Sequence, residues 1–257
     1  MRLANDDVGD GPAVLLIHGH PFDRKMWSGQ LGRLSGGFRV ITPDLRGYGE
    51  SSATPGVVSM RELADDVWML LDEVGVAEVS VVGLSMGGLV AMEMAIAEPR
   101  RVWALGLVAT SAAPVSDDER RERLAMADEV EATGMKALVR SMGPRLFGPR
   151  PDPDVVERVL AMMRRNDPRG SAAALRGRAA RPDYRDELRR LEMPSWVCVG
   201  SHDSWSTPAV TRELVDCLRV PRTLTLPGVG HLPNLEAPDR FDAALADFLE
   251  HAWKVRV

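Results

Sequence analysis

The sequence predicts an α/β fold in which helices cover both faces of a mostly parallel β-sheet. Short apolar runs alternate with helical patterns through residues 1–113 and again through 193–257, and this alternation is typical of a parallel sheet. The runs Ala13–Ile17 and Val102–Ala109 are apolar at successive positions, which indicates strands that are buried on both faces. A glycine-flanked serine, placed between a strand pattern and a helix pattern, is the third indication.

Before the strand that leads into this serine, the sequence pattern predicts two strands and two helices. Ala13–Ile17 is the first strand, and Met26–Leu34 can form a short helix. Arg39–Thr42 is the second strand, which runs into a loop rich in glycine. The capping-box pattern Ser59–Glu62 begins a helix whose apolar residues recur at helical spacing up to Gly75.

The segment Val79–Val90 is centred on Ser85, and Gly83–Gly87 matches the pattern G-x-S-x-G. A serine at the tip of a strand-to-helix turn has a strained backbone, and only small residues two positions before and after it let the two arms close. The helix N-terminus that follows favours developing negative charge. The pattern therefore predicts a nucleophilic serine.

The sheet pattern stops after Pro114 and resumes at Trp196–Gly200. We expect residues 114–192 to form an inserted unit of four or five short helices between two parts of the core, 1–113 and 193–257. The unit holds 17 basic and 15 acidic residues, which favours a solvated helical surface. The alternative is that one of its arginines pairs with an anionic substrate.

The second part of the core predicts two strands, each followed by a loop and a helix. Trp196–Gly200 is followed by a helix that Thr207 caps and Pro208 begins. Arg222–Leu226 is the last strand, and Pro238 begins the final helix.

A serine nucleophile needs a base, and the base needs an acid that orients it. His231 lies in a glycine-flanked loop after the last predicted strand, and Asp203 follows Trp196–Gly200. Reactive groups of such sheets lie beyond the carboxyl ends of strands, so we assign His231 as base and Asp203 as acid. Asp44, the remaining strand-end carboxylate, is expected to brace its loop through Arg46.

The tetrahedral intermediate of acyl transfer needs two N–H donors. Met86, next to the serine, is predicted to supply one from its backbone, and His20, in the loop after Ala13–Ile17, the other. We interpret the pair His18 and His20 as structural, because no spacing typical of zinc ligands is present. Neither a metal nor a cofactor is therefore expected.

Net charge, hydropathy and cysteine content indicate which classes of partner and which cellular compartment to expect. The net charge of −5 argues mildly against nucleic acid, and no apolar run approaches the roughly 18 residues of a membrane span. Cys198 and Cys217 lie in core-like segments, and the N-terminus has no signal-peptide pattern. We expect reduced thiols and a cytoplasmic protein.

Five segments, LLIHGHPFDRKMW, PDLRGYGES, GLSMGG, VGSHD and GVGHLPNLEAPDRF, resemble successive landmarks of the α/β-hydrolase superfamily. Within it the chain is most similar to cofactor-free haloperoxidases (perhydrolases), 3-oxoadipate enol-lactonases and carboxylesterases. The resemblance implies an eight-stranded sheet, a helical cap after the sixth strand, a triad of Ser85, Asp203 and His231, and an oxyanion hole of His20 and Met86. The short region before Ala13 suggests a reduced opening hairpin.

The expected function is cleavage of a small ester or lactone through an acyl-enzyme, with Trp27, Met86, Trp205 and Leu232 lining an apolar pocket under the cap. The resemblance implies that dehalogenases and epoxide hydrolases carry an aspartate at the nucleophile position, so Ser85 argues against both. Perhydrolase, C–C bond hydrolase and acyl-transferring or cyclising activities remain open, because a fold does not set the substrate. A hydrolase-fold ligand receptor or signalling protein with little turnover is the alternative outside enzymes.

Overall fold

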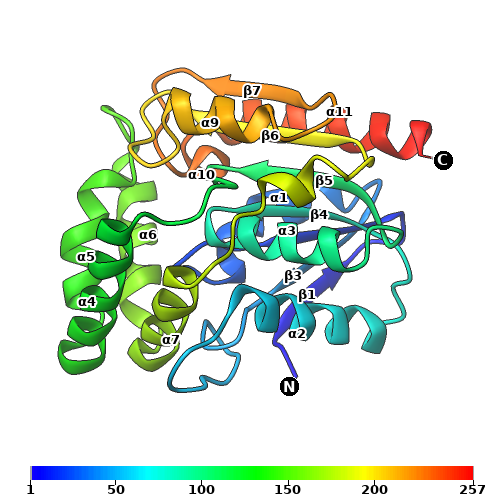
Figure 1. Ribbon diagram of the computed structural model, residues 1–257. Helices are drawn as coiled ribbons and strands as arrows, with labels where there is room; N and C mark the ends of the chain where they lie inside the picture. The colour runs from blue at the N-terminus through cyan, green and yellow to red at the C-terminus, as the bar shows by residue number, and fades with distance from the viewer. Residues whose placement is uncertain (1, 257) are drawn as a thin grey trace.

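The computed structural model describes residues 2–256, in which seven strands form one sheet (Figure 1). The strand order is β1-β3-β2-β4-β5-β6-β7, and every neighbouring pair is parallel except β1 and β3. The strands are β1 (Asn5–Val8), β2 (Ala13–Ile17), β3 (Arg39–Pro43), β4 (Val79–Leu84), β5 (Val102–Val108), β6 (Ser195–Gly200) and β7 (Arg222–Leu226).

The expectation of eight strands is wrong by one within the described residues. The chain before Ala13 forms a single short strand, β1, which pairs antiparallel with β3 at the sheet edge. Because the partner of β1 is β3, and residues 9–12 connect β1 directly to β2, no hairpin forms within residues 2–12.

Two apolar cores lie on the two faces of the sheet, because successive side chains of a strand point to opposite faces. Leu15 and Ile17 of β2 belong to one core, and Val14 and Leu16 to the other. The first core is covered by α2 (Met60–Glu73), α3 (Met86–Ala97), α8 (Arg185–Leu188) and α9 (Pro208–Val215). The second is covered by the 3-10 helix η1 (Arg24–Trp27), α1 (Ser28–Leu34), α10 (Pro233–Glu236) and α11 (Pro238–Val255).

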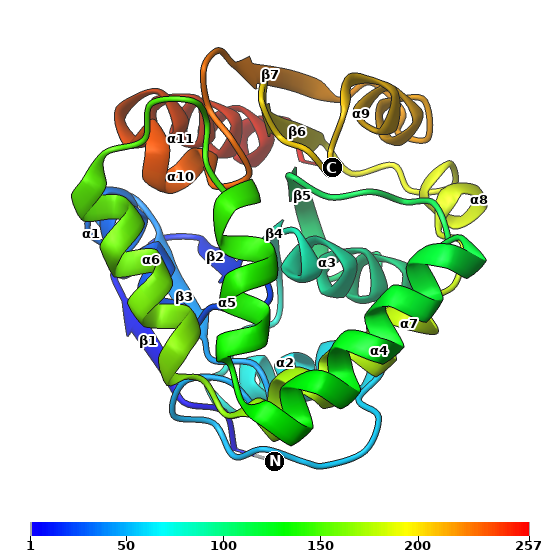
Figure 2. The same cartoon turned by 90° about the vertical axis from the view of Figure 1, so that its left-hand side faces the viewer.

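The segment between β5 and β6 contains helices and no strand. Its elements are α4 (Asp117–Thr133), α5 (Lys136–Met142), the 3-10 helix η2 (Gly143–Arg145), α6 (Pro153–Arg165), α7 (Pro168–Ala179) and α8. Local sequence explains where they begin, because Ser116 and Glu119 form a capping box and Asp152 and Asp167 each cap a helix with proline in its first turn. Helices α4 to α7 stand together beside one end of the sheet (Figure 2).

The loop after β3 is braced differently from the prediction. Asp44 pairs with Arg24 rather than with Arg46, and it also accepts the backbone N–H of Glu50 at 2.8 Å. Arg46 instead forms two hydrogen bonds of 2.6 Å with Asp66 of α2. Arg46, two residues after Asp44, thus pairs with helix α2, while Arg24 of η1 is the partner of Asp44.

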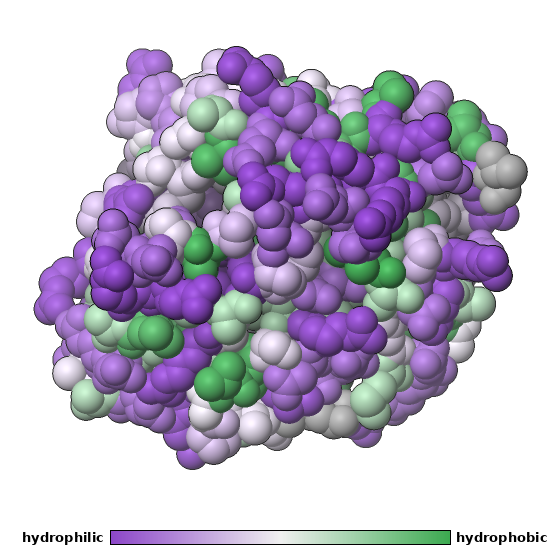
Figure 3. All heavy atoms as spheres, viewed as in Figure 1, coloured by the Kyte–Doolittle hydropathy of each residue, from purple (hydrophilic) through white to green (hydrophobic). Residues whose placement is uncertain are grey.

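Polar side chains dominate the surface seen in Figure 3, and the apolar residues on this face form small, separate spots. None of the helices formed by residues 2–256 combines the length and the apolar character that crossing a membrane requires.

Candidate active site

Ser85 lies at the turn between β4 and α3 and has a backbone φ of 54°. A positive φ is strained for a residue with a Cβ atom. Two hydrogen bonds hold this conformation: the Ser85 N–H donates to the Val108 carbonyl at 2.8 Å, and the Ser85 carbonyl accepts from Thr110 Oγ1 at 2.8 Å. The predicted strand and helix around the serine are both present, and the neighbouring strand β5 fixes the turn.

Backbone packing explains the two glycines of the turn. A Cβ atom on Gly83 would lie 2.1 Å from the Gly87 carbonyl oxygen, and one on Gly87 would lie 2.3 Å from the Ile17 carbonyl oxygen. Both distances are far shorter than a van der Waals contact. The G-x-S-x-G spacing is therefore a steric requirement of this strand-to-helix turn.

His231 and Asp203 form a buried hydrogen-bonded pair. His231 Nδ1 donates to Asp203 Oδ2 at 2.8 Å, and Asp203 Oδ1 accepts the N–H groups of Trp205 at 2.8 Å and Ser206 at 3.1 Å. Burial raises the pKa of Asp203, but the nearby His231 and these hydrogen bonds outweigh it and hold the pKa below its ordinary value. Asp203 is thus set to be an anion that orients the imidazole.

Glu236, which sequence reasoning missed, holds the loop that carries His231. Its Oε1 accepts the N–H groups of Gly230 at 3.0 Å and Leu232 at 3.3 Å, on either side of the histidine. Its Oε2 accepts the N–H of Gly148, from the segment between η2 and α6, at 2.7 Å. Burial raises the pKa of Glu236. Nothing in the local sequence distinguishes this glutamate from an exposed helix residue, because its role depends on how the His231 loop folds back onto it and on Gly148, which is 88 residues away in the chain.

One cavity of about 480 Å³ holds both Ser85 and His231 in its wall. Helices α4, α5 and α7 contribute Met126, Leu138 and Leu175 to the opposite side. This volume is typical of a small-molecule site. The serine, the base and the acid predicted from sequence thus meet at one place, although no hydrogen bond within residues 2–256 joins the Ser85 hydroxyl to His231.

The predicted pocket residues are mostly wrong. Trp205 lines the cavity, with its ring centroid 4.8 Å from that of His231. Trp27 and Leu232 are fully buried in the core, where Trp27 packs against Phe241, and neither lines the cavity. Met86 is also fully buried, next to Tyr48, and is absent from the lining. An apolar sequence position does not reveal whether its side chain faces a cavity or the core.

The loop after β2 packs directly against the serine. A Cβ atom on Gly19 would lie 3.4 Å from Ser85 Cβ and 3.0 Å from the Leu84 carbonyl oxygen. The backbone N–H groups of His20 and Met86 donate no hydrogen bond to any group of the described chain. For Met86 this follows from its position, since the first N–H groups of a helix have no partner within it.

Strand order explains why these loops meet. The chain passes from β2 to β3 on one side and then to β4 on the other side of β2. At such a switch point the loops beyond the carboxyl ends of the two strands diverge, and ligands of open α/β sheets bind in the crevice between them.

The histidines His18 and His20 have buried structural partners. His18 Nδ1 lies 2.9 Å from the Gly19 carbonyl oxygen, and its Nε2 accepts the N–H of Leu45 at 2.9 Å, so the ring is neutral. Burial lowers its pKa, consistent with this. His20 Nδ1 lies 2.6 Å from the Tyr48 hydroxyl. Residues 2–256 contain no cluster of three or more histidine, cysteine or acidic side chains arranged to hold a metal ion.

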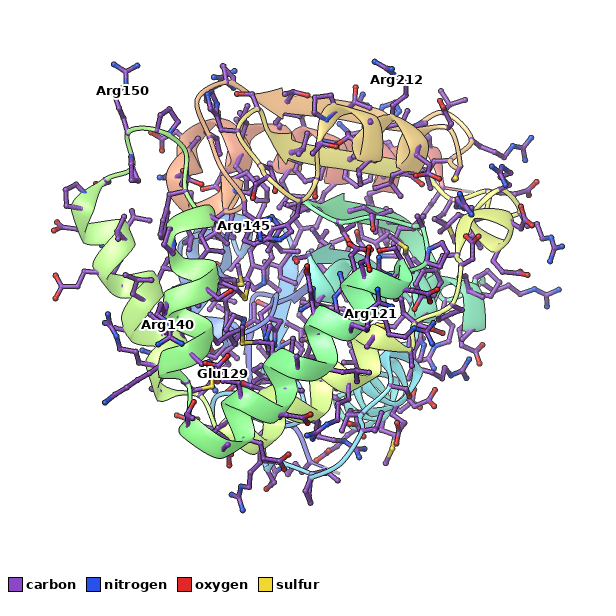
Figure 4. The ribbon with its side chains drawn as sticks, turned by 60° about the vertical axis from the view of Figure 1, so that its left-hand side comes forward. Arg121, Glu129, Arg140, Arg145, Arg150 and Arg212 are labelled. Atoms are coloured by element: carbon purple, nitrogen blue, oxygen red, sulfur yellow. The ribbon has the colours of Figure 1, made fainter. Side chains whose placement is uncertain are left out.

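Four arginines also line the cavity, which sequence reasoning did not single out: Arg123, Arg145, Arg178 and Arg181. Figure 4 shows Arg145 between the helices and the core, whereas Arg150 and Arg212 point outward. The Arg145 guanidinium carbon lies 4.5 Å from the centroid of the Trp205 ring. The only sequence signal was the arginine-rich composition of the segment, which does not distinguish buried from solvated side chains.

The comparisons with known proteins agree with this fold. The family model described as "Alpha/beta hydrolase family" matches residues 14–244. The 3-oxoadipate enol-lactonase 1 of Acinetobacter baylyi is 27% identical over 247 residues, which cover 94% of this chain and 90% of that protein. A thermophilic esterase from Thermogutta terrifontis, with malate bound, is 38% identical with a TM-score of 0.95 and covers 97% and 93% of the two chains. The enol-lactonase of Burkholderia xenovorans is 32% identical, with a TM-score of 0.86 and 96% of both chains covered.

Proposed function

Because this chain belongs to the alpha/beta hydrolase family, we propose that it is a serine hydrolase that cleaves a small carboxylic ester or lactone through an acyl-enzyme. The observation that carries the proposal is the His231–Asp203 hydrogen bond of 2.8 Å, formed in the wall of the cavity that also contains Ser85. Two of the similar proteins named above are enol-lactonases and one is an esterase, and both activities break an acyl C–O bond.

The chemistry divides into two half-reactions. Ser85 Oγ attacks the carbonyl carbon while His231 Nε2 takes the hydroxyl proton, and Asp203 stabilises the imidazolium through Nδ1–H. The N–H groups of Met86 and His20 bind the oxyanion, each such donor typically contributing about 2.7–4 kcal/mol. His231 then gives its proton to the leaving oxygen. Water repeats the sequence on the acyl-enzyme and releases the acid and free Ser85.

We also propose that the helices within residues 114–192 act as a cap over the site. Support comes from α4, α5 and α7, which form one side of the cavity while Ser85 and His231 form the other. In this arrangement the core supplies the reacting groups and the cap supplies the surface that selects the substrate. A cytoplasmic setting is supported by Cys198 and Cys217, which are free and buried.

Labelling with a fluorophosphonate tests the nucleophile. The protein should gain one probe adduct, on Ser85, and the adduct should be lost in Ser85→Ala but kept in Ser52→Ala, which changes an exposed serine. A panel of p-nitrophenyl esters and lactones then identifies the bond that is cleaved. Absence of labelling together with absence of turnover would contradict the hydrolase and favour a ligand-binding protein of the same fold.

A further inference from the structure

The cavity that holds Ser85 carries an excess of positive charge. Four arginines line it, and the only carboxylates among its lining residues are Glu119 and Glu122, both exposed. Arg123 comes from α4, Arg178 from α7 and Arg181 from the segment just after α7. Since α4 packs along α7, three guanidinium groups gather on one wall of the cavity.

Arg178 has no partner among the described residues. No carboxylate of residues 2–256 lies within ion-pair distance of it, none of its N–H groups donates a hydrogen bond, and its Nε atom is buried and unsatisfied. Arg176, on the same helix, is the contrast: it bonds to Asp128 at 2.8 Å and to Glu131 at 2.6 Å. Carboxylates are therefore present near α7, but those of Asp128 and Glu131 pair with Arg176, and Glu119 acts on Arg178 only at a distance.

The two neighbouring arginines differ from Arg178 in how they are held. Arg181 donates to the Ala113 carbonyl at 2.9 Å and to Ser111 Oγ at 3.2 Å, which fixes its guanidinium group. Arg123 is 3.7 Å from Glu119, and its Nη1 is buried without a partner. Arg178 and Arg123 thus both offer unsatisfied donors in the same cavity.

The pKa shifts of Arg178 and Arg181 agree with three guanidinium groups lying close together in the cavity wall. Burial, followed by the charges of Arg123 and Arg181, lowers the pKa of Arg178 to about 9, which leaves it protonated at neutral pH. Burial, followed by Arg123, lowers the pKa of Arg181 to about 10. Arg178 is partly buried, and its Nε is fully buried without a partner. A charge so placed, without a bonded counterion, costs free energy, and an anion bound in the cavity would offset that cost.

Resting on the proposed hydrolase activity, we propose that Arg178, with Arg123 and Arg181 beside it, binds a free carboxylate of the substrate. The substrate class is then an ester or lactone that carries a second, ionised carboxyl group. The planar donors of a guanidinium match the two oxygens of a carboxylate. Leu89, Met126, Leu138 and Leu175 also line the cavity and supply an apolar surface for the carbon chain between the two groups.

The position of Arg178 places this subsite near the reacting bond. Arg178, from α7, and Ser85, from the turn between β4 and α3, both line the cavity of about 480 Å³. The charge of Arg178 also lowers the pKa of His20, after burial as the largest cause, which agrees with this placement. A substrate held by Arg178 therefore has its carboxylate on the cap side and its carbonyl group within reach of the core.

A matched pair of substrates tests the subsite by kinetics. The monophenyl ester of adipic acid and phenyl hexanoate have acyl chains of equal length, and only the first ends in a carboxylate. The kcat/KM ratio of the charged to the neutral ester should fall about 10- to 100-fold in Arg178→Met, as expected for loss of a hydrogen-bonded ion pair. Arg169→Met, which removes an exposed arginine of the same helix that pairs only with Asp167, should leave both rates unchanged. Monophenyl succinate and glutarate extend the test to shorter chains.

Binding without turnover provides an independent measurement. In the Ser85→Ala background, adipate or glutarate should raise the melting temperature, and hexanamide, which has the same chain length as adipate but no carboxylate, should not. The shift should disappear when Arg178→Met is added. Without any ligand, Arg178→Met should itself raise the melting temperature, because it removes a partly buried charge that has no bonded counterion. A lower melting temperature together with an unchanged ester ratio would overturn the proposal and assign Arg178 a structural role.

The two proposals fail in different ways. If the wild type cleaves both esters and Arg178→Met leaves their ratio unchanged, the carboxylate subsite is wrong and the hydrolase stands. If neither ester is cleaved and Ser85 is not labelled, the hydrolase is wrong, while the dicarboxylate shift still decides whether the subsite binds anions. An equal shift with inorganic phosphate would overturn the preference for carboxylate.

Discussion

His231 Nδ1 lies 2.8 Å from Asp203 Oδ2, although the two residues follow different strands of the sheet. The bond uses one ring nitrogen and leaves Nε2 as the nitrogen that can accept a proton. Asp203 itself accepts hydrogen bonds from two backbone N–H groups. These bonds fix the carboxylate, and the carboxylate in turn fixes the orientation of the His231 ring. Three consequences of this geometry, and one of the turn at Ser85, can be measured.

Asp203→Asn tests the orienting role of the carboxylate. An amide at this position can favour the wrong tautomer of His231, so kcat should fall by about 10³- to 10⁴-fold on the best ester of the panel, with the fold intact. Asp216→Asn, an exposed carboxylate, is the control and should retain wild-type kcat. A loss smaller than tenfold in Asp203→Asn would contradict the assignment of the acid.

The low pKa of Asp203 predicts a pH dependence of stability. A carboxyl group whose pKa is lower in the folded state stabilises the fold above its unfolded pKa, about 3.9. That contribution is lost as the pH falls through the lower, folded value. The difference in free energy of unfolding between wild type and Asp203→Asn should therefore shrink below about pH 4. Urea unfolding at a series of pH values measures it, and a difference that grows on acidification would contradict the direction of the shift.

Glu236→Gln tests the clamp on the His231 loop. One carboxylate oxygen becomes an NH₂ group that faces backbone N–H donors, so the free energy of unfolding should fall by about 1–3 kcal/mol. The kcat should fall too, because Gly230 and Leu232 flank His231. Glu250→Gln, an exposed glutamate of α11, is the matched control. Unchanged kcat despite lower stability would mean that Glu236 supports the fold without positioning the histidine.

Sequence predicted those parts of the site that depend on local geometry. Ser85 could be found because the turn requires glycine at positions 83 and 87, and this requirement is visible within the five consecutive residues Gly83–Gly87. Asp203 and His231 could be found because each follows a recognisable strand, and parallel strands bring their carboxyl ends to one edge. The strands and the core helices have equally local signals in apolar periodicity and caps.

Contacts between distant segments could not be predicted in this way. Arg178 differs from Arg176 only in the direction it faces once α7 packs on α4. Trp27 is an apolar residue near the site in sequence, but η1 turns its ring toward Phe241. Asp44 could have paired with any nearby arginine, and the packing of η1 selects Arg24. Each outcome depends on tertiary packing that no short pattern contains.

Gly83→Ala tests whether the turn at Ser85 tolerates any side chain. The added methyl group would lie 2.1 Å from the Gly87 carbonyl oxygen, and both partners are backbone in the core, so neither can rotate away. The strand and helix must separate, which should lower the free energy of unfolding by more than about 3 kcal/mol and displace Ser85. Fluorophosphonate labelling should slow even in protein that remains folded.

Gly32→Ala is the matched control for this change. Gly32 lies in α1, is exposed, and has no atom within 4 Å of the added methyl group. Alanine is the better helix former, so this variant should gain about 0.5–1 kcal/mol and label at the wild-type rate. The two glycines thus predict opposite signs for the same chemical change, because one faces backbone and the other faces solvent. Wild-type stability and labelling in Gly83→Ala would show that the close approach of the two arms is not what holds Ser85 in its strained conformation.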